Sequence, residues 1–92
     1  MTLYFVGFEA EMPGVPRPGP EQWLGGWDSI CLYDGAWLVD CPLAAHQVRN
    51  ALQPCLGDDE PAIVLELKAG SRWASEHVER PALDWLRSHV LN

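Results

Sequence analysis

Residues 29–41 read SICLYDGAWLVDC, with two short apolar segments on either side of Asp34-Gly35. Asp-Gly between two such segments is a strong signal for a β-hairpin, because glycine accepts the positive φ that a two-residue turn requires. We therefore predict two paired strands, at residues 29–33 and 36–41. Side chains alternate between the two faces of a strand, so one face of this hairpin should be buried.

The flanking segments extend the hairpin into an α+β domain. Residues 2–9 are rich in β-branched and aromatic residues and predict a first strand, and residues 62–67 predict a fourth. Residues 21–24 predict a helix of one or two turns that Gly25-Gly26 stops. Residues 42–56 have a helical apolar period, which Pro54 should distort near its end.

A last helix is predicted to open at Pro81, a favourable first helical position. The order β-α-β-β-α-β is typical of the ferredoxin-like fold, an antiparallel sheet with helices on one face. We expect a single ferredoxin-like domain over residues 1–92, with a shortened first helix and an added C-terminal helix. Only this tail is available to cover the other sheet face, so we expect two copies to pair across that face or along a sheet edge.

The charge balance excludes two classes of partner. The 92 residues contain six Lys and Arg against 13 Asp and Glu, a net charge of -7 at pH 7. Non-specific binding to nucleic acid and docking on anionic lipid both need a basic surface, so neither is an expected partner. No apolar run approaches the ~20 residues of a membrane span. The N-terminus lacks the features of a signal peptide, so we expect a cytoplasmic protein.

The three cysteines, Cys31, Cys41 and Cys55, predict free thiols at buried positions. They are an odd number at unequal spacings, and no CxxC pair indicates a zinc site. Cys31 and Cys41 are not opposite each other in a two-residue hairpin, so we expect no disulfide between them. Free thiols fit a reducing compartment, and no cofactor is expected.

Carboxylates are the main candidates for chemistry. Glu9 ends the first strand, while Asp28, Asp34 and Asp40 come from the hairpin region. A carboxylate pair or triad is able to bind a hard divalent cation. Strand-end carboxylates are common, however, and we expect a solvated acidic surface without a metal. The histidines occur in no HExxH or GxSxG motif and are expected to be exposed. They are His46, His77 and His89.

Five tryptophans are many for a chain of this length. A small core has little room for all of them, and tryptophan is enriched at protein interfaces. Trp73 lies in a segment without helical or strand periodicity, and we predict that it is an interface anchor, together with Trp27 and Trp85. The alternative for Trp73 is that it folds back over the sheet.

Several of these segments together resemble the SinR-like proteins and their relatives, the Cas-two family of CRISPR adaptation. The segment LYFVGFEAEMPG at residues 3–14 resembles the family's opening strand, acidic residue and Pro-Gly loop. AWLVD at 36–40, VRNAL at 48–52 and AIVLEL at 62–67 follow in the family's order, and Trp85-Leu86 resembles its C-terminal pair. The resemblance implies a ferredoxin-like fold, dimerisation and, in some members, metal-dependent nuclease activity.

Glu9 matches the position at which this family carries an Asp, and its side chain is one methylene longer. Because a preorganised metal site tolerates only ~0.5 Å of displacement, we predict a non-catalytic protein-interaction module that forms a homodimer and binds itself or another protein. Two alternatives stay open. One is a metal-dependent nuclease that uses Glu9, and the other is an acidic phage-type inhibitor, similar to anti-CRISPR proteins, that occupies a basic groove by charge mimicry.

Overall fold

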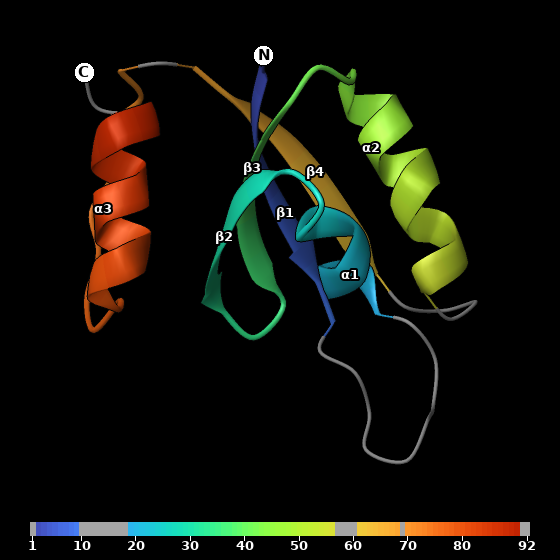
Figure 1. Ribbon diagram of the computed structural model, residues 1–92, viewed down its shortest axis with the longest axis horizontal. Coiled ribbons are helices and arrows are strands. Elements are labelled where there is room, and N and C mark those ends of the chain that lie inside the picture. Colours follow the sequence, from blue (N-terminus) through green and yellow to red (C-terminus); the bar gives the residue numbers. More distant parts are fainter. Residues whose placement is uncertain (1, 10–18, 57–60, 69, 91–92) are drawn as a thin grey trace.

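Four strands form one antiparallel sheet, and three α-helices pack against it (Figure 1). The computed structural model describes residues 2–9, 19–56, 61–68 and 70–90. In chain order the elements are β1 (Thr2–Phe8), α1 (Pro20–Leu24), β2 (Asp28–Tyr33), β3 (Ala36–Cys41), α2 (Ala45–Leu52), the 3-10 turn η1 (Gln53–Cys55), β4 (Ala62–Leu67) and α3 (Arg80–His89). The predicted α+β class, short first helix and C-terminal helix are confirmed.

The strand order is β2-β3-β1-β4, and every neighbouring pair is antiparallel. The β2–β3 hairpin turns at Gly35, whose φ of 81° explains the need for glycine there. β1 lies in the middle, paired with β3 on one side and β4 on the other. β2 and β4 are therefore the edge strands of this sheet.

Both faces of the sheet carry a hydrophobic cluster. One cluster joins β1 and β3 to α1 and α2. Its buried members are Tyr4, Val6, Phe8, Leu24, Val39, Cys41, Val48 and Leu52. The other cluster lies on the opposite face, where Leu86 and Val90 at the end of the chain pack on Leu38 of β3. Figure 1 shows α2 and α3 on opposite sides of the sheet. The tail thus covers part of the face that the other helices leave open.

The second helix is shorter than the predicted 42–56. α2 begins after Ala44, whose backbone N–H donates to Gln47 Oε1 at 2.8 Å, and it ends at Leu52. The chain continues as the turn η1 because Pro54 has no N–H for a helical hydrogen bond. The longest helix among the described ranges is α3, with 10 residues, and no helix there has the length and apolar character to cross a membrane.

The three thiols occupy different environments. Cys41 is buried, Cys55 is half-buried and Cys31 is exposed, and all three are free. The expectation of burial is wrong for Cys31, because it lies on the edge strand β2. The strand pairing places Cys31 opposite Trp37 and Cys41 opposite Thr2, so the two hairpin cysteines do not face each other.

Candidate functional site

The four candidate carboxylates lie in two pairs at opposite ends of the hairpin. Asp28 and Asp40 are direct partners in the β2–β3 register. Glu9 follows β1, and the Phe8 amide donates to the Gly35 carbonyl at 2.8 Å, so Glu9 lies at the end of the sheet that carries the Asp34 turn. Six residues separate Asp34 from Asp40, which is about 20 Å of extended chain. The four carboxylates are therefore not one contiguous group.

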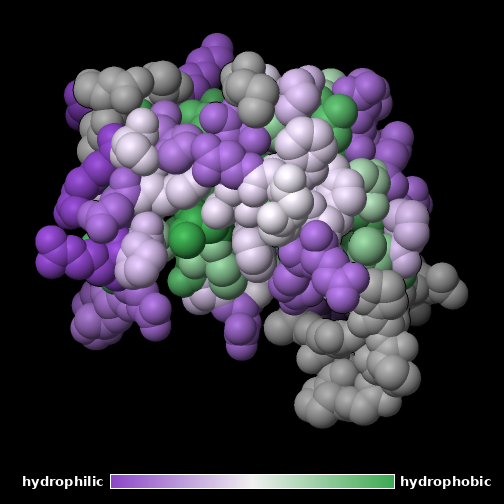
Figure 2. All heavy atoms as spheres, viewed as in Figure 1, coloured by the Kyte–Doolittle hydropathy of each residue, from purple (hydrophilic) through white to green (hydrophobic). Residues whose placement is uncertain are grey.

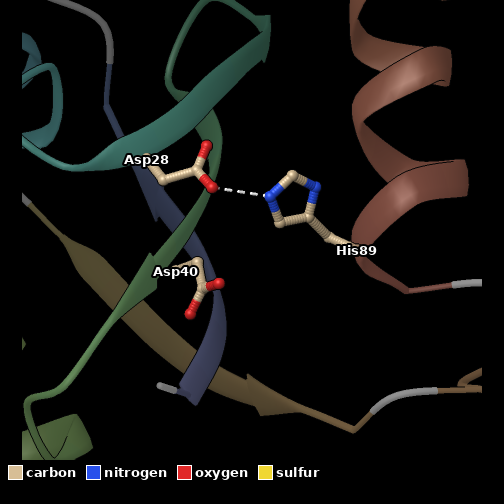
Figure 3. Close-up of side chains that lie close together, drawn as sticks. All are labelled: Asp28, Asp40 and His89. Atoms are coloured by element: carbon tan, nitrogen blue, oxygen red, sulfur yellow. Dashed lines mark hydrogen bonds and ion pairs between the residues drawn. The ribbon is translucent and has the colours of Figure 1, made fainter.

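Asp28 and Asp40 form a cluster with His89 of α3 (Figure 3). His89 Nε2 lies 2.6 Å from Asp28 Oδ2, and the two side chains point toward each other. Each of the three residues contributes one ligand-type atom to a group in which all atoms lie within 4.8 Å of one another. Among the residues that the structure describes, this is the group of metal-ligand type, and Glu9 is not part of it.

Trp85 orients both partners of this pair. Its indole Nε1 donates to Asp28 Oδ1 at 3.0 Å, and its ring stacks on the His89 imidazole with centroids 3.8 Å apart. The Trp85 backbone carbonyl lies 2.9 Å from His89 Nδ1. Ser88 Oγ lies 2.8 Å from the same nitrogen, so Nδ1 is held on the helix side and Nε2 faces the Asp28 carboxylate. The spacing of four residues on one helix makes this stacking favourable.

Asp40 is incompletely satisfied. Its Oδ1 atom is buried and has no hydrogen-bond partner in the described ranges. Among the residues that the structure describes, His89 is the basic side chain that pairs with Asp28. An unpaired buried oxygen costs about 1–3 kcal/mol. The lack of a hydrogen-bond donor for Asp40 Oδ1 therefore opposes the stability of this part of the fold.

The environment shifts the pKa of both members of the close pair. Burial lowers the pKa of His89, but the hydrogen bond to Asp28, the Trp85 carbonyl and the charges of Asp28 and Asp40 together outweigh it, so the pKa is raised above 6.5. The hydrogen bond from His89 is the largest cause that lowers the pKa of Asp28 below 3.8, followed by that from Trp85. Each group thus favours its charged form more strongly than it does in the unfolded chain.

These shifts predict how stability depends on pH. His89 stabilises the fold fully below its unfolded pKa, and this contribution is lost as pH rises through its raised pKa. The Asp28 contribution is present above its unfolded pKa and is lost as pH falls through its lowered pKa. The pair should stabilise the protein most between these limits, by about 1 kcal/mol or less, because the Asp28 side chain is 54 % exposed.

The measurement is the free energy of unfolding against pH, with EDTA present to exclude metal ions. Wild type should lose stability relative to His89→Gln, which has no titrating imidazole at this position, as the pH rises above about 6.5 and through the raised pKa of His89. Asp28→Asn should flatten the same curve. Parallel curves for wild type and both variants would contradict this prediction.

The candidate tryptophans all make contacts within the domain. Trp27 packs on the first cluster and lies 5.8 Å from the Trp23 ring, while Trp85 and Trp73 pack on the second cluster. The Trp73 indole Nε1 is buried without a partner in the described ranges. Trp73 therefore folds back over the sheet, and its role at an interface stays a prediction.

An apolar groove of about 320 Å³ lies between this folded-back segment, α3 and the sheet. Trp73, Val78 and Leu86 line it together with side chains from all four strands, including Leu65 and Leu67 of β4. In the view of Figure 2, a hydrophobic patch reaches the surface between the side that carries α3 and the middle of the molecule. The second sheet face is therefore only partly covered.

β4 presents apolar side chains on one face of an edge strand. Among the described residues β4 pairs with β1 alone, and Ile63 and Leu65 are 53 % and 48 % exposed. A second groove, of about 260 Å³, runs beside this strand on the face that carries α2. His46 and Arg49 of α2 line it together with residues 62–64.

Sequence reasoning missed His89, which is half-buried rather than exposed; His46 and His77 are exposed as expected. His89 is 61 positions from Asp28, so no local motif joins them. The available signal is the pair Trp85 and His89, four residues apart on the last helix.

No protein-family model, curated protein or solved structure matches the chain.

Proposed function

We propose that the protein is a non-catalytic protein-interaction module that forms a homodimer through the free edge of β4. The observation that carries this proposal is the exposure of Ile63 and Leu65 on an unpaired edge strand. Such an edge is a template for pairing with another strand, and natural proteins usually protect it with charges or proline. Within β4 the only charged residue is Glu66.

Pairing with a second copy extends the apolar face across the interface. Two β4 strands related by a two-fold axis would run antiparallel, and each sheet face would continue from one copy to the next. Registers that differ by two residues all keep like faces together. Of these, one places Leu65 opposite Leu65 of the second copy, and another places it opposite Ile63 of the second copy. Both bury the two most exposed leucine and isoleucine side chains of the described residues.

The opposite face offers charge complementarity. In these two registers, Glu66 of the second copy lies opposite Val64 or Ala62. Both residues line the groove that carries His46 and Arg49. Arg49 of one copy would therefore lie near Glu66 of the other copy. The net charge of -7 on each copy opposes association at long range, so higher salt should strengthen the dimer by screening this repulsion.

We also infer a ferredoxin-like class for this domain. Support comes from the strand order, which reads β4-β1-β3-β2 from the other edge, from the antiparallel pairs and from the packing of α1 and α2 on one cluster. The resemblance to SinR-like and Cas-two proteins carries the same fold and dimerisation as expectations. A cytoplasmic location remains part of this proposal.

Sedimentation at micromolar concentration tests the dimer. Wild type should sediment as a dimer, and Leu65→Arg should weaken association by about 30-fold or more, because it buries a charge in an apolar contact. Tyr33→Arg is the matched control, since Tyr33 is 64 % exposed on the other edge strand. A monomeric wild type, or dissociation by Tyr33→Arg but not by Leu65→Arg, would reject the β4 interface.

Charge reversal then tests the pairing across the interface. Arg49→Glu and Glu66→Arg should each weaken the dimer, and the double variant should recover a large part of the lost affinity, because it restores opposite charges. Additive losses in the double variant would show that these two residues do not meet.

A further inference from the structure

We propose that Asp28, Asp40 and His89 form a binding site for one divalent transition-metal ion. The site lies at the β2–β3 side of the sheet, two strands away from the β4 edge, so it does not depend on the proposed dimer. Its ligands are two carboxylates from neighbouring strands and one imidazole from the C-terminal helix (Figure 3).

The pairing of two carboxylates across neighbouring strands favours a bound cation. Asp28 and Asp40 are direct partners across β2 and β3, and like charges at such positions destabilise a sheet. The buried Asp40 Oδ1 atom has no hydrogen-bond donor among the described residues. A bound cation would neutralise both carboxylates and remove this repulsion.

His89 has the orientation of a metal ligand. Its Nδ1 contacts the Trp85 carbonyl at 2.9 Å, which leaves Nε2 directed at the carboxylates. Metal-bound histidines commonly donate their second N–H to a backbone carbonyl in this way. The Trp85 ring stacks on the imidazole and the Trp85 N–H holds Asp28, so both ligands are positioned before a metal arrives.

The ligand set favours Zn²⁺ over Ca²⁺, Mg²⁺ or Mn²⁺. Imidazole suits Zn²⁺, whereas the other three ions prefer oxygen ligands. Tetrahedral coordination at bond lengths near 2.1 Å separates ligand atoms by about 3.4 Å, so small side-chain rotations from the present spacing within 4.8 Å would suffice. Asp28 is 54 % exposed, which leaves room for solvent at the remaining position.

Calorimetric titration of the EDTA-treated protein with Zn²⁺ tests the site. Wild type should bind one ion per chain. Asp40→Asn and His89→Gln remove ligands while keeping side-chain size, and each should weaken binding by at least about 10-fold. Circular dichroism of each variant establishes that the loss is not a loss of folding, and Asp40→Asn serves as the test if His89→Gln unfolds.

Three controls separate this site from other ligands. Asp34→Asn and His77→Asn change an exposed carboxylate and an exposed imidazole outside the cluster and should leave affinity unchanged. Cys31→Ser removes the exposed thiol and should also leave it unchanged. The proposal is overturned by absence of saturable binding to wild type, by undiminished binding in Asp40→Asn and His89→Gln, or by loss of binding in Cys31→Ser.

Discussion

Replacing Tyr4 by alanine is expected to lower the free energy of unfolding by about 3–5 kcal/mol, the range for removing a buried aromatic side chain. Tyr4 is 1 % exposed and lies on the central strand β1, within the cluster that joins the sheet to α1 and α2. Domains of this size have total stabilities of about 5–10 kcal/mol. The variant should therefore be marginally folded. Urea unfolding, followed by tryptophan fluorescence, measures the change.

Tyr4→Phe separates the ring from its hydroxyl. The Tyr4 O–H donates to the Leu43 carbonyl at 2.7 Å and thereby ties the segment before α2 to the sheet. Losing this hydrogen bond should cost only about 0.5–1.5 kcal/mol, since the ring still fills its space. A cost for Tyr4→Ala no larger than that for Tyr4→Phe would contradict the placement of Tyr4 in the core.

The fold was largely predictable because its signals are local. Asp34-Gly35 indicates the turn, and β3 and β4 have the predicted bounds, 36–41 and 62–67. Pro54 distorts the end of the second helix as expected. The start of that helix was less predictable, because residues 42–44 have the apolar period of a helix but lie in the approach to α2.

The candidate site was not predictable, because a β-bulge creates it. A two-residue turn that pairs Tyr33 with Ala36 would, without interruption, place Ser29 opposite Asp40 and turn Asp28 to the other face. The register shifts between Cys31 and Tyr33, so Asp28 becomes the partner of Asp40. A shift of one residue exchanges the faces of a strand, and no residue type in this stretch signals it.

The third ligand depends on how the last helix docks. α3 has 10 residues, fewer than an isolated helix needs to be stable in water, so its position rests on packing. Its contact with the sheet runs through Leu86 and Val90 on Leu38. The sequence shows which side of this helix is apolar, but not which end of the sheet it covers, and that choice brings His89 to Asp28.

Leu86→Ala is accordingly expected to lower the free energy of unfolding by about 2–3 kcal/mol and to loosen α3 locally. Leu86 is 8 % exposed beneath the helix, and its removal leaves a cavity that the open second face can partly close, so the cost falls in the lower part of the range for Leu→Ala. Alanine favours helix, so the loss comes from packing and not from helix propensity.

The distinguishing measurement is hydrogen exchange at the amides of α3. Leu86→Ala should accelerate exchange there more than in β1 and β3, because the helix opens without unfolding the first cluster. Leu83→Ala on the same helix is the control, since Leu83 is only half-buried and lies outside the buried members of the second cluster. It should cost about 1 kcal/mol and change exchange little. Equal effects of the two variants would mean that Leu86 does not anchor α3, and that His89 reaches Asp28 for another reason.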